Sequence, residues 1–210
     1  MAAVLATGAI LGLHYYRQTS RLVLEASDNV FTAMGRDVVQ ELARTYAPVQ
    51  TLVDVLAAQQ ALSQSQSASD GERRAAVFVE ALRGNPALAA IYVGYDNGAF
   101  LLVRPTGDEH LRALFDAPGG TAYVVQNVDI DSNGAQASFR YLREDFSTIE
   151  VRARPDFRFD PRTRDWYRAA LDRRRHVWTA PYAFFTTREP GITVARAAGG
   201  SAVVGADVTL

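Results

Sequence analysis

The sequence contains no cysteine and no lysine among its 210 residues. Without cysteine there is neither a disulfide framework nor a thiolate metal site, so thiol chemistry is excluded. The basic residues are all arginines, and they are scattered along the chain rather than grouped in blocks. With a net charge of −1, the chain lacks the basic patch that nucleic-acid binding requires, and we expect no nucleic-acid partner.

Motifs of the common enzyme classes are also absent. The sequence has no Walker phosphate loop, no His-Glu-x-x-His, no Gly-x-Ser-x-Gly and no Gly-x-Gly-x-x-Gly after a strand. His14, His110 and His176 lie in separate segments. A catalytic triad converges only in the fold, so a hydrolase stays open as a third hypothesis. We expect a protein that is not an enzyme and that has no cofactor.

One segment starts like a calcium loop, with Asp129, Asp131, Asn133 and Gly134 at the required spacing. Such a loop also needs a bidentate glutamate at its twelfth position, where this chain has Arg140. An Asn-Gly pair between two alternating runs is instead typical of a hairpin turn. The sequence therefore favours a turn and no metal site.

The most apolar stretch covers residues 1–16 and ends in Tyr15, Tyr16 and Arg17. It is shorter than the roughly 20 residues that cross a bilayer, but aromatic residues followed by arginine are typical of a membrane interface. Three hypotheses compete: a truncated transmembrane anchor, the core of a signal peptide and a buried helix. The stretch has no basic start and continues as a helix, which favours the anchor.

A long helix is predicted over residues 17–63, because apolar residues recur there at helical spacing without a glycine-proline cluster. Together with the anchor it would be roughly 90 Å long, too long for one globular domain. Its apolar seam suits a parallel homodimer, and the alternative is that the seam packs on the chain's own domain. Pro48 predicts a bend near Ala47.

The remaining residues, 70–210, are expected to form one module of the α+β class, with a central antiparallel sheet flanked by helices. A short helix over residues 72–83, capped by Asp70, would carry Val77, Phe78 and Leu82 inward. A second helix is predicted over 163–173. The predicted strands cover 89–95 and 99–104, joined by an Asp-Asn-Gly turn, then 121–130, 136–143, 148–154, 191–197 and 202–210.

Both tryptophans lie in the segment from Phe157 to Tyr182, together with several arginines. Asp160-Pro161 suits a turn into a helix capped by Thr163, which would place Arg164 and the residues after it in the first turn. An arginine fork, helix amide groups and aromatic faces together suit a small carboxylate. The alternative is that the aromatic residues are core and that Arg164 pairs with a neighbouring acid.

A family resemblance favours the pocket. The run Phe-Asp-Pro-Arg-x-Arg-x-Trp-Tyr-x-x-Ala resembles the membrane-distal module of double Cache sensor domains, which are PAS-like extracytoplasmic domains of bacterial transmembrane receptors. The resembling segments cover 90–98, 159–170, 177–182, 191–196 and 204–210.

The resemblance implies roles for individual side chains. Arg164 and Trp166 would hold a ligand carboxylate, while Tyr167, Tyr182 and Asp207 would surround its ammonium group. Amino-acid-binding members of the family prefer tyrosine where this chain has Phe159. The missing hydroxyl leaves the ligand open among amino acids, other carboxylates and amines.

The resemblance also implies a sensing function. We expect a ligand-binding domain in the periplasm or outside the cell, attached to the inner membrane by its N-terminal helix and truncated before a second, membrane-proximal module. The ending Gly-Ala-Asp-Val-Thr-Leu most resembles Cache regions of nucleotide cyclases, with chemoreceptors, histidine kinases and cyclic-dinucleotide enzymes as alternatives. The second hypothesis is a dimerisation or protein-interaction module without a small ligand.

Overall fold

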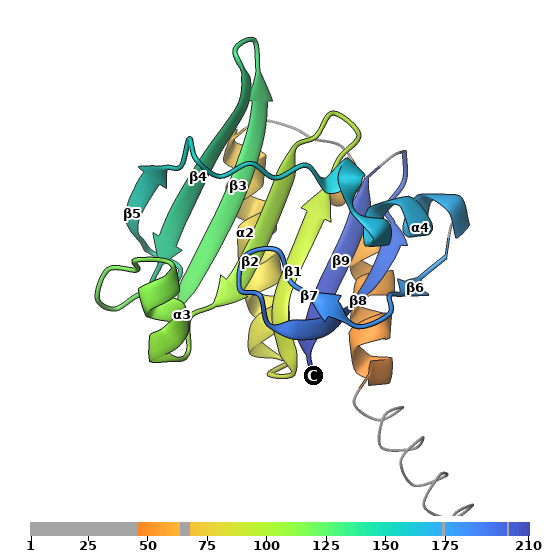
Figure 1. The fold of residues 1–210 in the computed structure, drawn as a ribbon, viewed down its shortest axis with the longest axis horizontal. Helices are drawn as coiled ribbons and strands as arrows, with labels where there is room; N and C mark the ends of the chain where they lie inside the picture. The colour runs from red at the N-terminus through yellow and green to blue at the C-terminus, as the bar shows by residue number, and fades with distance from the viewer. Residues whose placement is uncertain (1–45, 64–67, 174, 201) are drawn as a thin grey trace, which may run out of the picture. The chain divides into compact units, whose positions relative to one another are not determined.

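The computed structural model describes residues 46–63, 68–173, 175–200 and 202–210 (Figure 1). The compact unit runs from Ala47 to Leu210 and so begins earlier than the predicted module at residue 70. The reason is that the helical residues 47–57 bury Val49, Val53 and Leu56. This helix ends at residue 57 and is followed by η1 (Gln60–Leu62).

Several predictions on the N-terminal part fall outside the described residues. These are the anchor over residues 1–16, the helix over 17–45 and the segment before the bend expected near Ala47. Among the described helices, none combines the length and the apolar character needed to cross a membrane.

The described residues form one nine-stranded sheet in which every pairing is antiparallel. The strand order is β5-β4-β3-β2-β1-β9-β8-β6, and β7 pairs with β8. The predicted α+β class with a central antiparallel sheet is therefore confirmed. The strands are β1 (Leu88–Gly94), β2 (Phe100–Pro105), β3 (Tyr123–Asp131), β4 (Gly134–Leu142), β5 (Thr148–Ala153), β6 (Val177–Trp178), β7 (Tyr182–Ala183), β8 (Pro190–Ala197) and β9 (Val203–Thr209).

Both predicted hairpins are present because their turn residues act locally. Between β1 and β2, Gly98 has a φ of 92°, which glycine adopts without strain, and the Asn97 side chain accepts a hydrogen bond from the amide of Ala99. Between β3 and β4, the Asp131 carboxylate accepts a hydrogen bond from the amide of Asn133 at 2.7 Å. The segment that begins like a calcium loop is thus a tight hairpin turn.

Helix α2 (Ala68–Arg83) packs on one face of β1 and β2, on the same side of the sheet as the helical residues 47–57 (Figure 1). Phe78 and Leu82 are buried as predicted, but Val77 is 38% exposed and Val79 is buried in its place. Asp70 lies inside the first turn rather than at the cap. A further helix that the sequence analysis did not predict, α3 (Glu109–Leu114), is capped by the Asp108 carboxylate.

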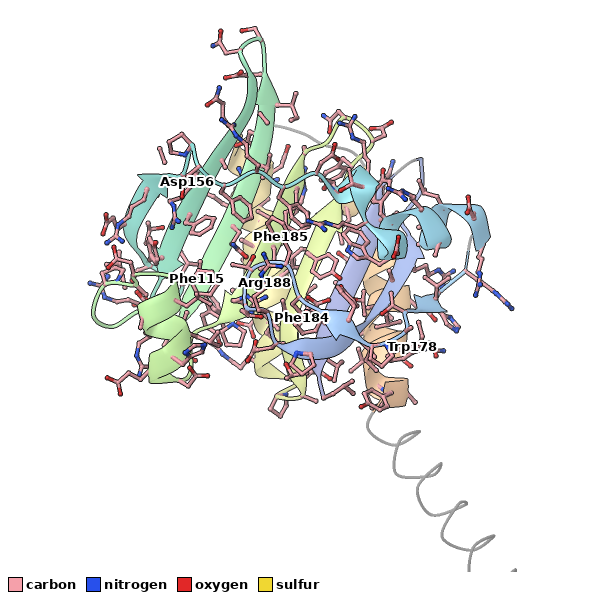
Figure 2. The ribbon with its side chains drawn as sticks, in the orientation of Figure 1. Phe115, Asp156, Trp178, Phe184, Phe185 and Arg188 are labelled. Carbon is pink, nitrogen blue, oxygen red and sulfur yellow. The ribbon has the colours of Figure 1, made fainter. Side chains whose placement is uncertain are left out.

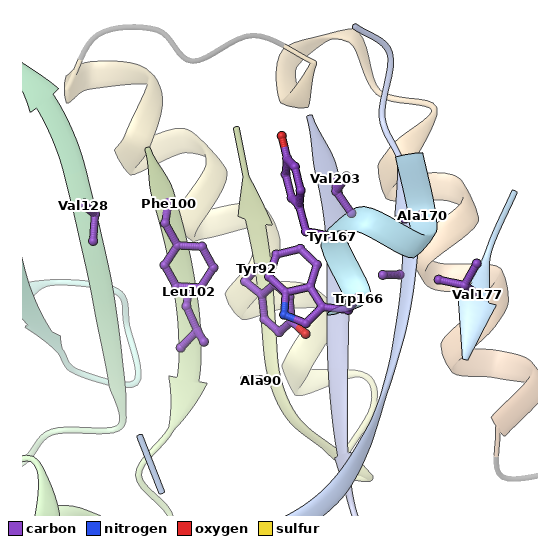
Figure 3. Close-up of a cluster of buried hydrophobic side chains, with 11 residues drawn as sticks. Ala90, Tyr92, Phe100, Leu102, Val128, Trp166, Tyr167, Ala170, Val177 and Val203 are labelled. Carbon is purple, nitrogen blue, oxygen red and sulfur yellow. The ribbon is translucent and has the colours of Figure 1, made fainter. Parts of the chain in front are cut away.

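The other face of the sheet is covered by η2 (Pro161–Thr163) and α4 (Asp165–Arg173) (Figure 1). Here Trp166 packs against Tyr92, with ring centroids 4.8 Å apart, in a cluster that also contains Phe100 and Leu102 (Figure 3). Because side chains alternate along a strand, residues two apart on β2 share this face. The face turned away from α2 therefore carries the residues of the candidate site.

Candidate functional site

A pocket with a volume of about 80 Å³ lies between this face of the sheet and the segments around η2, α4 and β7; we call it the inner pocket. Five of the six predicted site residues line it: Phe159, Arg164, Trp166, Tyr182 and Asp207. The other lining residues are Tyr92, Phe100, Leu102, Arg104, Gln126, Phe157, Ala183, Phe184, Phe185 and Thr186.

Tyr167 is the predicted site residue that the fold does not bring into the pocket. Its side chain is 3% exposed and belongs to the hydrophobic cluster beneath α4. The hydroxyl groups of Tyr92 and Tyr167 point in opposite directions (Figure 3). Consecutive residues on a helix face directions about 100° apart, and here Trp166 lines the inner pocket while Tyr167 does not.

Asp207 on β9 is the acceptor in a buried hydrogen-bond network. Its Oδ1 atom accepts from the Tyr92 hydroxyl at 2.7 Å and from the Thr193 hydroxyl at 2.6 Å. Since the Thr193 hydroxyl donates to Asp207, the Tyr182 hydroxyl, 2.7 Å away, donates to Thr193. Tyr92 and Thr193 were missed by the sequence analysis because both occur inside strands that read as apolar runs.

Gly205 makes the approach of Tyr92 to Asp207 possible. Gly205 and Tyr92 are paired across β1 and β9, and the Tyr92 ring lies where a Cβ atom at position 205 would be. Any larger residue at 205 would therefore push the ring away from the strand. Because Gly205 has no side chain, the Tyr92 hydroxyl can reach the carboxylate of Asp207, two residues further along β9.

The electrostatic state of Asp207 follows from this environment. Complete burial raises the pKa of the carboxyl group from 3.8 to about 6, against the opposing effects of the hydrogen bonds from Thr193 and Tyr92 and of the Arg104 charge. Burial also raises the pKa of Tyr182 to about 12, so this hydroxyl stays protonated. Asp207 is thus a buried carboxylate that a cationic partner would stabilise in its charged form.

Arg164 stands at the entrance to α4, in the extended conformation (φ −93°, ψ 141°) that precedes a helix. The predicted cap at Thr163 is wrong, because its hydroxyl donates to the carbonyl of Asp160 within η2 and the helix begins at Asp165. The guanidinium carbon of Arg164 lies 4.9 Å from the ring centroid of Phe159 and 4.4 Å from that of Phe185.

Within the described part of the chain, Arg164 forms no ion pair, and its buried Nε has no hydrogen-bond partner. Removal from water lowers the pKa of its guanidinium group. The alternative that Arg164 pairs with a neighbouring acid is therefore not what the fold shows. Aromatic faces hold this cation in place and leave its donors free for another partner.

Two further polar residues line the pocket, and the sequence analysis missed both. Arg104 on β2 is 2% exposed and Gln126 on β3 is fully buried. Neither the Nε of Arg104 nor either amide atom of Gln126 has a partner among the described residues. An unsatisfied buried polar group costs about 1–3 kcal/mol, so their presence needs a reason beyond packing.

A second hollow of about 370 Å³ adjoins the first; we call it the outer pocket. Arg164, Trp166 and Tyr182 line both pockets, and Trp178 and Thr179 line the outer one. Figure 2 shows Phe184 and Phe185 on the segment after β7, in front of the sheet, with Trp178 to one side. No group of three or more acidic or histidine residues in the described ranges could hold a metal ion.

Comparison with known proteins supports the fold. No family model matches the chain. Adenylate cyclase 1 of Rhizobium meliloti is 32% identical over 214 residues, which cover 99% of this chain and 31% of that protein. The chain thus spans less than a third of the curated relative that it matches.

Among solved structures, the ligand-binding domain of the Pseudomonas fluorescens chemoreceptor CtaA is similar. Its complex with L-isoleucine superposes with a TM-score of 0.55 at 20% identity, over 90% of this chain and 59% of that chain. Its complex with L-serine gives 0.53 at 20% identity, over 88% and 60%. The chain has the fold of these sensory domains, which confirms at the level of fold the resemblance found in the sequence.

Proposed function

We propose that this chain, which has the fold of a Cache-type sensory domain, binds a small solute carrying both a carboxylate and an ammonium group. One observation carries the proposal: Arg164 and Asp207 face the same pocket with opposite charges, and they form no ion pair with each other in the described structure. A zwitterion fits between such groups, because each of its charges finds the opposite charge on the protein.

Arg164 is the residue that holds the carboxylate in this proposal. Its guanidinium carbon lies 4.9 Å from the Phe159 ring and 4.4 Å from the Phe185 ring, and its buried Nε has no hydrogen-bond partner among the described residues. A planar fork of donors binds a carboxylate through two parallel hydrogen bonds, which are strengthened where water is excluded. Trp166 forms the adjoining wall.

Asp207 receives the ammonium group. Its carboxylate is held by the Tyr92 and Thr193 hydroxyls, and the Tyr182 hydroxyl supplies a further acceptor oxygen on the pocket wall. An ammonium ion has three donors and needs acceptors around a negative charge. The two ligands in the CtaA complexes, L-isoleucine and L-serine, are also zwitterions.

The wider function that we propose is extracytoplasmic sensing in a membrane receptor. The similarity to an adenylate cyclase, of which this chain spans 31%, supports a cyclase as the output domain. Ligand binding would bias the domain between two conformations, and the N-terminal helix would relay the change, within a parallel homodimer, across the inner membrane. The chain itself would not be the enzyme.

The experiment is a thermal-shift screen of the purified 210-residue chain against amino acids, amines and small carboxylates. A bound solute raises the unfolding temperature because it binds only the folded state. We expect Arg164→Ala to abolish the shift by zwitterions, since the partner of the carboxylate is lost. Arg173→Ala, on the exposed side of α4, is the matched control and should keep the shift.

The proposal fails if no solute stabilises the folded chain. That result would favour the alternative in which the aromatic residues serve only as core and the domain acts through dimerisation. A shift that survives Arg164→Ala would overturn the assignment of the carboxylate partner.

A further inference from the structure

The inner pocket contains more positive charge than a simple amino acid needs. Arg104 and Gln126 project from β2 and β3 on the face that also carries Leu102, which pairs with Gln126 in the sheet. Both residues line the pocket that contains Asp207, and both are more than nine-tenths buried. An arginine and an amide thus line a cavity whose other polar groups already suit a zwitterion.

We propose that the ligand is an α-amino acid with an acidic side chain, and that Arg104 and Gln126 bind its distal carboxylate. This inference rests on the proposed function and adds the class of ligand. Arg164 would hold the α-carboxylate, Asp207 the ammonium group, and Arg104 with the Gln126 amide nitrogen the second carboxylate. Charge then balances in the occupied pocket, with two arginines and an ammonium group facing three carboxylates.

Other partners for Arg104 within the fold are weaker. Asp207 and Glu189 lie near enough to attract its charge, but neither forms an ion pair with it in the described structure. The Phe115 ring lies 5.7 Å from its guanidinium carbon, which offers a face but no hydrogen-bond acceptor. A water molecule could hydrogen-bond to Gln126, but it would leave the buried charge of Arg104 unbalanced. An anionic group accepts hydrogen bonds from the Arg104 guanidinium group and from the Gln126 amide nitrogen at once, while the Gln126 amide oxygen stays available for a donor such as water.

The size of the cavity limits the length of such a ligand. The inner pocket has a volume of about 80 Å³, and the outer pocket shares Arg164 with it. An α-carboxylate at Arg164 would therefore lie at the border between the two pockets, with the side chain directed inward. We therefore expect a short acidic side chain, as in aspartate or glutamate.

The test is isothermal titration of the 210-residue chain with L-aspartate, L-glutamate, their amides L-asparagine and L-glutamine, L-norvaline, and succinate. We expect one of the two acidic amino acids to bind at least about tenfold more tightly than its amide, which is the effect of one charge-assisted contact. Arg104→Met should remove that preference while changing the affinity for the amides less than about threefold. Gln126→Leu should weaken the binding of the acidic amino acid by a smaller factor than Arg104→Met does.

The two variants replace buried polar groups by apolar ones of similar length, and Arg173→Ala is again the control. The unfolding temperature of each variant without ligand shows that it is folded before affinities are compared. If Arg104→Met unfolds the chain, Gln126→Leu alone tests the distal carboxylate site. This variant should bind the acidic amino acid more weakly while its affinity for L-norvaline, which has no side-chain carboxylate, stays unchanged.

The outcomes separate this inference from the proposed function. If neutral amino acids bind as tightly as acidic ones, or if the preference survives Arg104→Met, the distal carboxylate site is wrong while the zwitterion site stands. Tighter binding of succinate than of L-aspartate would overturn the ammonium site at Asp207. If none of these solutes binds, the inference is overturned together with its premise.

Discussion

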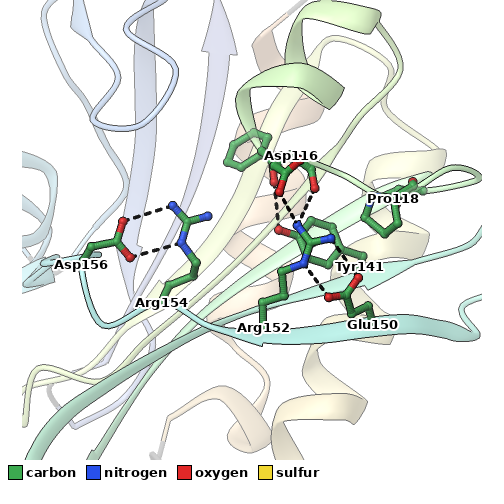
Figure 4. Close-up of polar contacts among 9 residues, drawn as sticks. Asp116, Pro118, Tyr141, Glu150, Arg152, Arg154 and Asp156 are labelled. Atoms are coloured by element: carbon green, nitrogen blue, oxygen red, sulfur yellow. Dashed lines mark hydrogen bonds and ion pairs between the residues drawn. The ribbon is translucent and has the colours of Figure 1, made fainter.

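Arginine is used in opposite ways at the β5 edge of the sheet and in the inner pocket. Around β5, Arg152 contacts Glu150 at 2.6 Å and Asp116 at 2.8 Å, and Arg154 lies 3.3 Å from Asp156 (Figure 4). All of these acids are at least 41% exposed. In the inner pocket, Arg104 and Arg164 are buried or half-buried and have no ion pair within the described residues.

The difference shows which charges serve the fold and which serve a ligand. A solvated arginine that pairs with its neighbours costs little to fold and contributes little stability. A buried arginine without a partner lowers stability, so its retention indicates a second role. The predictions below test this contrast through stability alone, in the absence of ligand.

The largest effect is expected from pH. The pKa of Asp207 is raised by burial to about 6, so the folded state binds more protons than the unfolded state between about pH 4 and pH 6. Its contribution to stability is therefore complete below pH 4 and is lost as the pH rises through 6, a change of roughly 3 kcal/mol. Tyr92, Thr193, Tyr182 and Arg104 are the groups that face it.

The carboxylates of the surface pairs act in the opposite direction. The hydrogen bond from Arg152 lowers the pKa of Glu150, that from Arg154 lowers the pKa of Asp156, and that from Arg140 lowers the pKa of Glu72. Their contribution is present above their unfolded pKa values and is lost as the pH falls.

Urea unfolding of wild type and Asp207→Asn between pH 4 and 8 isolates the contribution of Asp207 to the free energy of unfolding. If this free energy changes equally with pH in the two proteins, the raised pKa of Asp207 is contradicted.

The second effect concerns Arg104 without ligand. Arg104→Met replaces an unpartnered buried cation by an apolar side chain, and we expect the free energy of unfolding at pH 7 to rise by about 1–2 kcal/mol. Chemical denaturation measures it. A loss of stability would mean that Arg104 is held by Asp207 and Glu189 as part of the folded core, and the contrast between the two regions would disappear.

The smallest effect is expected at the surface. Arg152→Met removes the contacts to Glu150 and Asp116 and the contact with the Tyr141 ring, at 4.9 Å from the guanidinium carbon. Because these acids remain in water, we expect a small decrease in the unfolding temperature that shrinks further at high salt. A decrease larger than the change caused by Arg104→Met would contradict the view that the β5 pairs are weak.

Local signals explain why much of the fold could be predicted. The Asn97-Gly98 and Asn133-Gly134 turns are specified by residues that tolerate or require positive φ, and they set two hairpins of the sheet. The predicted site residues come from a cluster in the sequence, from Phe159 to Tyr182, and from the family motif at Asp207, and five of the six line the inner pocket. In α2, Val77 and Val79 are two residues apart and lie on nearly opposite faces of the helix, so the face that packs on the sheet buries Val79 and exposes Val77.

Four polar residues of the pocket and its network could not be found from the sequence, because each occurs within a strand and carries no motif of its own: Tyr92, Arg104, Gln126 and Thr193. Whether such a residue faces α2, solvent or the pocket depends on the register of strands that are distant in the chain. Tyr167, for which the family motif predicts a ligand contact, packs in the hydrophobic cluster beneath α4, and its role stays a prediction.

The sequence by itself thus determined the α+β class, the hairpins and the segment that carries Arg164 and Trp166, because turns and periodicity act over a few residues. Only the tertiary structure decided which polar side chains share the pocket. The pairing of β1 with β9 over Gly205 brings Tyr92 to Asp207, and the pairing of β2 with β3 puts Gln126 beside Leu102, on the face of Arg104. Burial and the absence of partners are properties of these long-range contacts, so the charge pattern of the pocket arises only when the sheet is complete.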